Sequence, residues 1–121
     1  MISPLLVLTT LPHYYAMVPA ILANHPSYAV VVFASSTLSV IWHSTGHMME
    51  LDYTLAVVWC VYDVYLSWKL GILLNLIVFL TNLLAETHDA HCAWHVLSCS
   101  RAIAFSMYIF RDPSVAYNTL Q

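Results

Sequence analysis

Residues 70–85, LGILLNLIVFLTNLLA, decide the fold, because this apolar run contains no charged side chain. Its composition is typical of a helix that crosses a lipid bilayer. The rest of the chain has the same character. Of 121 residues, 61% are hydrophobic and 7% are charged, whereas soluble domains have about 45–50% apolar and about 25% charged residues. A domain of this size has too little interior to bury so many apolar side chains. The sequence therefore predicts an integral membrane protein.

Four further apolar stretches, separated by short polar breaks, lie on either side of this run. If one span takes about 20 residues, five spans use nearly the whole chain. We therefore predict an all-α fold with a single domain over residues 1–121, a polytopic transmembrane helix bundle. The five predicted spans cover residues 2–23, 28–43, 52–68, 70–85 and 91–110.

The charged residues exclude one class of function and orient the chain. Three Lys and Arg against six Asp and Glu give a net charge of −3, so the sequence offers no basic surface for a nucleic acid. With five spans, Lys69 and Arg111 fall on one side of the membrane, and the loops on the other side have neither Lys nor Arg. The positive-inside rule then places the C-terminus in the cytoplasm, and the N-terminus in the lumen or outside the cell.

Polar side chains gather at one predicted membrane edge. Ionisable groups within spans are costly and tend to mark function, and this chain has seven histidines. The span count puts the end of the second span, the start of the third and the start of the fifth at the same edge. The polar residues at these three places are Ser39, His43, Asp52, His91 and His95. We therefore expect these five side chains to approach one another.

The spacing of the histidines predicts a metal site. His91 and His95 are four residues apart, so on a helix their imidazoles lie on one face, about 6 Å apart, and can reach one ion. His43 from a facing helix would supply a third nitrogen. Three histidines leave the fourth tetrahedral position free, which is the arrangement of a catalytic rather than a structural zinc ion. A Zn²⁺ ion held in this way lowers the pKa of its water to about 7.

Asp52 and Ser39 are the candidate catalytic residues beside this zinc site. Asp52 could take the proton from the water and pass it to a leaving amine. Ser39, one turn deeper than the histidine of its own span, could hydrogen-bond a ligand or an oxyanion. His88, near the same helical stripe, is the first substitute if one of the three predicted ligands is wrong. His47, in a polar loop, is the second.

These motifs resemble those of the CREST superfamily of membrane hydrolases, which includes the alkaline ceramidases and the progestin/adiponectin-receptor-like proteins. The strings SVIWH, LDY and HCAWHVL are similar to the motif regions of that superfamily and occur in the same order. The resemblance covers roughly residues 35–60 and 88–105.

The resemblance implies a function and assigns the site residues. It implies hydrolysis of a lipid amide such as ceramide, with a membrane lipid as the substrate. It matches His43, His91 and His95 to the zinc ligands, and Ser39 and Asp52 to the accompanying serine and aspartate. The superfamily has a seven-helix core, so a second copy of this shorter chain could complete the substrate pocket in a homo-oligomer.

Two other classes of function fit parts of the sequence. A haem-binding electron carrier would hold its haem between two histidines, such as His13 or His43 with His95, but it gives the candidate catalytic residues no role. For His13, a hydrogen bond to a neighbouring helix is the simpler prediction. A small non-enzymatic bundle, such as a channel or an assembly factor, would need no metal. Metal analysis and the presence or absence of a Soret band separate the three classes.

Asp63 and Arg101 lie away from the predicted zinc site. Counted from the starts of their spans at about 1.5 Å per residue, both lie about 15–16 Å from the zinc edge, near the bilayer midplane. A lone charge at that depth is expensive, and such residues usually face the bundle interior and pair. We therefore predict an ion pair that joins the third span to the fifth, with Asn75 or Asn82 available to share its hydrogen bonds.

Overall fold

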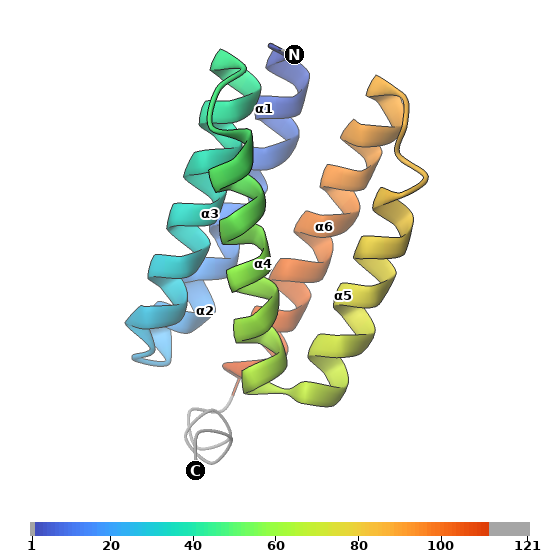
Figure 1. Cartoon of the computed structure of the whole chain (residues 1–121). Helices are drawn as coiled ribbons and strands as arrows, with labels where there is room; N and C mark the ends of the chain where they lie inside the picture. Colours follow the sequence, from blue (N-terminus) through green and yellow to red (C-terminus); the bar gives the residue numbers. More distant parts are fainter. Residues whose placement is uncertain (1, 112–121) are drawn as a thin grey trace.

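The computed structural model describes residues 2–111, and within them every regular element is a helix (Figure 1). The elements are α1 (Pro4–Thr10), the 3-10 helix η1 (Leu11–Ala16), α2 (Met17–Leu22), α3 (Pro26–Thr45), α4 (Met49–Leu66), α5 (Trp68–Asn82) and α6 (His88–Ile109). The first three follow one another without a break and form one rod, called the first rod below. The predicted all-α class is confirmed.

Prolines shape the first rod. Ser3 caps it by accepting a hydrogen bond from the Leu6 N–H at 3.3 Å, and Pro4 occupies the first turn, where its missing N–H leaves no carbonyl unpaired. Pro12 lies at the start of η1, where the chain tightens into a 3-10 helix. The predicted span 2–23 therefore forms a helix with a tightened middle section.

The other four predicted spans correspond to helices whose ends differ by a few residues. α3 continues through Thr45 and ends at Gly46, which has a left-handed φ of 76°. α4 begins at Met49, three residues before the start of the predicted third span. α6 likewise begins at His88. Hydropathy misses these first turns because helix N-terminal turns favour polar and acidic residues.

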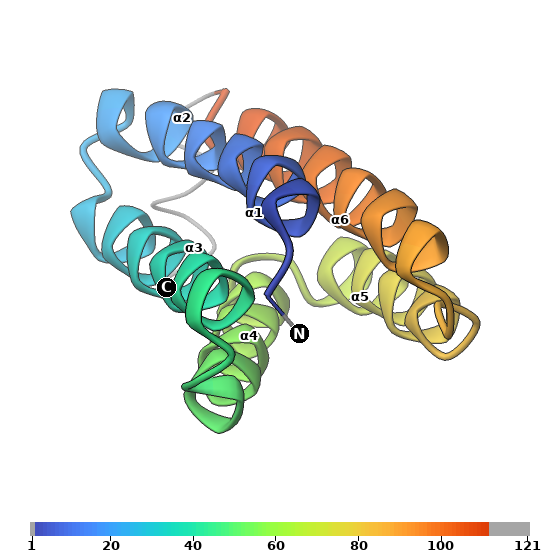
Figure 2. The same ribbon diagram turned by 90° about the horizontal axis from the view of Figure 1, so that it is seen from above.

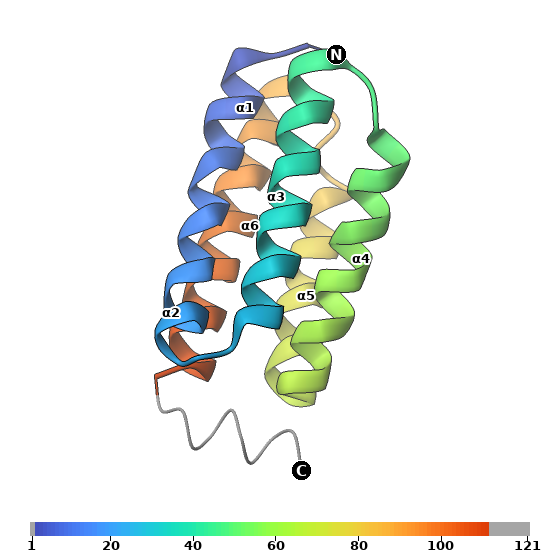
Figure 3. The same ribbon diagram turned by 90° about the vertical axis from the view of Figure 1, so that its left-hand side faces the viewer.

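The helical rods run alongside one another with alternating direction (Figures 1 and 3). We call the end at which α3 ends and α6 begins the histidine end, because His43 and His91 lie there. The first rod and α4 also begin at this end, and α5 ends there (Figure 1). Seen from above, α6 lies beside the first rod, and α3 lies beside α4 (Figure 2). Three helices therefore deliver the predicted site residues to one end of the bundle.

The apolar core fills the half of the bundle away from the histidine end. Alanines at contact points let the helix backbones approach closely. The buried cluster consists of Ala16, Ala20, Tyr28, Ala29, Val32, Trp59, Leu66, Ala102, Phe105, Ile109 and Phe110. The buried side chains of the other half are mainly polar, among them His43, Asp52 and His95. The buried apolar side chains are therefore concentrated in one half, and most of the buried polar side chains lie in the other.

α4 and α5 form a close hairpin joined by the single residue Ser67. Ser67 N–H donates to the Asp63 carbonyl oxygen at 2.9 Å, and Gly71 N–H donates to Ser67 O at 2.7 Å. A Cβ atom built on Gly71 would lie 2.7 Å from that same Asp63 oxygen. Glycine is therefore required here, because the start of α5 lies against the α4 backbone.

The predicted ion pair is confirmed. The Arg101 guanidinium of α6 binds the Asp63 carboxylate of α4, and both side chains are buried. Tyr28 of α3 donates a hydrogen bond to the other carboxylate oxygen at 2.7 Å, and Trp59 Nε1–H donates to the Tyr28 oxygen at 3.0 Å. The pair therefore joins three helices, not only the two that were predicted.

The predicted hydrogen bond from α5 to the ion pair is wrong for Asn75. Its amide Nδ2 donates to the Cys60 carbonyl oxygen at 3.3 Å rather than to Asp63 or Arg101. The place that the prediction gave to an asparagine is taken by the hydroxyl of Tyr28. Depth along a helix does not determine the direction in which a side chain faces, and the prediction used depth alone.

Large apolar side chains also cover the outside of the helices, including Leu22 at 80% and Leu84 at 79% exposure. By length and hydropathy, one continuous helical stretch within residues 2–111, Pro4–Leu22, is able to cross a membrane. Such a stretch near an N-terminus is typical of a membrane span or of a signal sequence. α5 is apolar but shorter.

Candidate metal centre

His43, His91 and His95 meet at the histidine end of the bundle. His43 comes from the last turn of α3, and the other two come from successive turns of one face of α6. One ring nitrogen from each of the three lies within 4.8 Å of the other two. His43 and His95 are buried, and His91 is partly buried. The predicted three residues therefore form a cluster that could hold a metal ion.

The spacing within the cluster fits a tetrahedral ion. Two nitrogen ligands of a tetrahedral zinc ion, each about 2.0–2.1 Å from the metal, lie about 3.3 Å from one another. The Nε2 atoms of His43 and His95 are 3.2 Å apart. The ring centroid of His91 lies 4.8 Å from that of His95 and 5.4 Å from that of His43. The donor set is uniform, three imidazoles, which suits zinc and other borderline metals.

Thr10 of the first rod determines the hydrogen position on His95. Its hydroxyl donates to the Leu6 carbonyl oxygen at 2.8 Å, which uses its only hydrogen. The same oxygen must therefore accept a hydrogen bond from His95 Nδ1–H, at 2.7 Å. This pairing leaves the lone pair of His95 on Nε2, the atom that faces His43. Thr10 thus orients an imidazole that is ready to bind a metal, as outer partners of metal ligands do.

The two substitute ligands lie outside the cluster. The His88 ring is hydrogen-bonded through Nε2 to the Ser3 hydroxyl, at 2.8 Å. His47 is exposed in the α3–α4 connection, where its backbone N–H donates to Thr45. Neither substitute belongs to the group of nitrogens that lie within 4.8 Å of one another.

His13 is held between the first rod and α6. Its Nδ1–H donates to the Thr10 carbonyl oxygen at 2.9 Å, so its Nε2 accepts the hydrogen bond of the Ser98 hydroxyl, at 3.1 Å. The predicted hydrogen bond to a neighbouring helix is confirmed. Both ring nitrogens of His13 are therefore occupied, although its ring lies 6.4 Å from that of His95.

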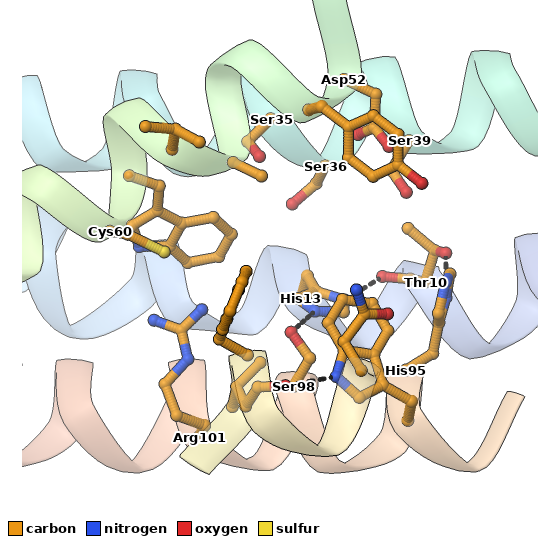
Figure 4. A pocket seen from close by; sticks show the side chains of 18 of the residues that line it. Thr10, His13, Ser35, Ser36, Ser39, Asp52, Cys60, His95, Ser98 and Arg101 are labelled. Carbon is orange, nitrogen blue, oxygen red and sulfur yellow. Dashed lines mark hydrogen bonds between the residues drawn. The ribbon is translucent and has the colours of Figure 1, made fainter. Parts of the chain in front are cut away.

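A cavity of about 440 Å³ adjoins the cluster. Its walls are mainly apolar and come from the first rod and from α3, α4, α5 and α6. All five predicted site residues line it, namely Ser39, His43, Asp52, His91 and His95. Figure 4 shows Asp52 and Ser39 on the α3–α4 side of the cavity, and His95 and Arg101 on the α6 side. The predicted catalytic pair and the histidines thus border one cavity.

Asp52 and Ser39 differ in their surroundings. Asp52 is buried in the first turn of α4. Ser39 is partly buried on α3, four residues before His43. Both side chains face the cavity (Figure 4).

Thr10 is the residue that the sequence analysis missed. It lies 85 residues from His95 along the chain, within an apolar stretch in which a threonine carries no pattern of its own. Only a rule that searches for the partner of each ligand imidazole would have sought a hydroxyl in a neighbouring helix.

Comparisons of the chain with protein-family models, with curated proteins and with solved structures gave no match. The assignment of this site therefore depends on its own geometry. That geometry is a buried cluster of three histidines, with one imidazole oriented by Thr10, in the wall of an apolar cavity.

Proposed function

We propose that this protein is a zinc-dependent integral-membrane hydrolase that cleaves a lipid amide. The observation that carries the proposal is the three-histidine cluster in the wall of a largely apolar cavity. His43, His91 and His95 would hold the zinc ion, which would supply a water molecule whose pKa is lowered to about 7. The resemblance to the CREST superfamily supports the same reaction class and a ceramide-like substrate.

The proposed chemistry assigns one task to each polar group. In amide hydrolysis, a water oxygen bonds to the carbonyl carbon and the carbon–nitrogen bond breaks, which yields a carboxylate and an amine. Asp52 accepts the proton that the water loses and gives it to the leaving nitrogen. Ser39 donates a hydrogen bond to the carbonyl oxygen as negative charge develops there. The apolar cavity takes the acyl chain of the substrate.

Zinc is the proposed metal because of the ligand set. Magnesium and calcium prefer oxygen ligands, whereas imidazole suits zinc, copper, iron and nickel. Within residues 2–111 the cluster contains no thiolate and no carboxylate. Among the metals that imidazole suits, zinc supports hydrolysis without redox chemistry.

A multi-pass arrangement in the membrane is part of the proposal. Every helical rod exposes large apolar side chains, for example Leu8, Phe33, Val61, Phe79 and Met107. Exposure of so much apolar surface to water is unfavourable, whereas the acyl chains of a bilayer would solvate it. Lys69 and Arg111 lie at the end opposite the histidines, which supports a cytoplasmic C-terminus and a lumenal or extracellular zinc site. A second copy of the chain as partner belongs to the same proposal.

The two alternative functions, a haem-binding electron carrier and a non-enzymatic bundle, account for less of the site. Nε2 atoms 3.2 Å apart in His43 and His95 leave no room for a porphyrin between them, and both ring nitrogens of His13 are already hydrogen-bonded. A non-enzymatic bundle gives no reason for the alignment of His95 by Thr10. The hydrolase proposal uses both the close approach of His43 to His95 and the alignment of His95 by Thr10.

Elemental analysis of detergent-purified protein, together with a lipid-amide hydrolysis assay, tests the proposal. We expect about one zinc ion per chain in the wild type. His91→Ala should lose most of the zinc, and the exposed His47→Ala is the matched control that should keep it. Stoichiometric zinc in single alanine variants of His43, His91 and His95 would contradict the ligand assignment. A zinc-loaded wild type that cleaves neither lipid amides nor lipid esters would contradict the enzyme.

A further inference from the structure

A second, smaller cavity of about 130 Å³ lies against the other side of the histidine cluster. It is lined in part by Glu86, Thr87 and His88, in the α5–α6 connection and the first turn of α6. Trp42, His43 and His91 line both this cavity and the 440 Å³ cavity. The histidine cluster therefore stands between a large apolar cavity inside the bundle and a small, more polar one at its end.

Among residues 2–111, acidic side chains gather at the end of the bundle where the small cavity lies. Leaving histidines aside, the charged side chains at the histidine end are all acidic within residues 2–111, namely Glu50, Asp52, Glu86 and Asp89. Lys69 and Arg111 lie at the opposite end, and Arg101 is paired in between. Glu86 is the acid that lines the small cavity.

The start of α6 does not offset this negative charge. A helix N-terminus favours anions through its unpaired N–H groups. Here the Thr87 hydroxyl accepts the hydrogen bond of the Ala90 N–H at 3.1 Å, and Asp89 adds a carboxylate to the first turn. A zinc ion on the histidines would add positive charge at one wall, so discrimination against an anion depends on the opposite wall, where Glu86 lies.

We propose that the small cavity holds a short polar amine part of the lipid amide, such as an ethanolamine group, rather than the long-chain amine of a ceramide, and that Glu86 selects against an anionic group there. This inference rests on the proposed hydrolase function. With the amide bond at the histidines, an acyl chain in the large apolar cavity leaves the amine part on the opposite side, in the small one. A carboxylate accepts hydrogen bonds from a hydroxyl or ammonium group and repels a sulfonate or a phosphate. The amine that leaves takes up a proton, and the same carboxylate then attracts the ammonium product.

A matched pair of substrates tests this selection. N-palmitoylethanolamine and N-palmitoyltaurine share one acyl chain, but the first ends in a neutral hydroxyl and the second in a sulfonate. We expect the wild type to prefer the ethanolamide in kcat/KM, and Glu86→Lys to shift that preference toward the taurine amide by about ten- to a hundredfold. Glu86→Gln should give a smaller shift in the same direction. Added salt should weaken the effect, since the site opens to solvent.

Asp89→Lys is the control, because Asp89 is a fully exposed acid three residues away that lines neither cavity. It should change the substrate preference by less than about threefold. An equal shift in both lysine variants would show a general surface-charge effect and would overturn the inference. A wild type that cleaves neither amide contradicts the proposed function instead. In that case, native mass spectrometry measures the binding of the same two amides and so tests the role of the small cavity separately from hydrolysis. If wild type and Glu86→Lys each bind the two amides equally well, the inference about the small cavity is overturned.

Discussion

The Thr10 hydroxyl lies 2.7 Å from Nδ1 of His95 and ties the first rod to a candidate metal ligand on α6. Because this hydroxyl also donates to the Leu6 carbonyl oxygen, it can only accept from the imidazole. The first rod thus decides which nitrogen of His95 carries a proton. A hydrogen bond between the first rod and the last helix of the fold therefore leaves Nε2 of His95 free to bind a metal ion.

Thr10→Val should weaken zinc affinity by about ten- to a hundredfold, the usual effect of removing the outer partner of a metal-ligating histidine. Thr10→Ser should retain most of the affinity, since it keeps the hydroxyl. Thr9→Val is the control, because the Thr9 hydroxyl bonds only to carbonyls of its own helix. Competition with a chromophoric chelator measures the affinities. Equal affinity in Thr10→Val and wild type would show that Thr10 does not orient the ligand.

Asp52→Asn should keep the zinc but lose turnover by about 10²–10⁴-fold, because a positioned general base contributes about that much. Glu50→Gln is the matched control, since Glu50 lies in the same first turn of α4 but does not line the cavity. Zinc content and kcat on a lipid amide are measured on the same preparations. Wild-type kcat in a zinc-replete Asp52→Asn variant would remove Asp52 from the mechanism.

Ser39→Ala should lower kcat by less than Asp52→Asn does, because it removes one hydrogen bond and leaves the proton carrier in place. Ser44→Ala is its control on the same helix, since the Ser44 hydroxyl is exposed and bonds to the Ile41 carbonyl. Steady-state kinetics on preparations of equal zinc content compare kcat of Ser39→Ala with that of Asp52→Asn and of the control. A larger loss in Ser39→Ala than in Asp52→Asn would reverse the assigned roles.

Asp63→Asn and Arg101→Gln should each destabilise the bundle by about 3–5 kcal/mol, because each leaves a buried charge without its partner. The double variant should recover part of the summed loss, since neither charge is then left alone. Thermal unfolding in detergent measures all four proteins. Strictly additive losses would show that the two side chains do not stabilise one another.

Much of the candidate site could be predicted because it depends on regular geometry. Counting spans gives the end of the bundle at which a residue lies, and a four-residue spacing gives the shared face of His91 and His95. The equal depth of Asp63 and Arg101 in the bundle followed from the helical rise of about 1.5 Å per residue. These rules need no knowledge of which helix packs against which.

The rest depended on how each helix is rotated about its axis. Tyr28 rather than Asn75 reaches Asp63, because α5 directs that asparagine toward the Cys60 carbonyl. Thr10 meets His95 only because the first rod packs beside α6. Such contacts between distant segments leave no periodic signal in one sequence. Helix starts were missed for another reason, because their polar first turns look like loops to a hydropathy window.

The uneven packing of the bundle has a consequence for its motions. Local opening requires least free energy where few apolar contacts hold the helices, so the histidine half should open while the packed half stays closed. A lipid could then enter sideways between helix ends, with the cluster around Phe105 acting as the fixed hinge. Backbone amides near Asp52 should accordingly exchange with deuterium faster than those near Leu66. The half of the bundle that contains the candidate site is therefore also the half with the larger motions.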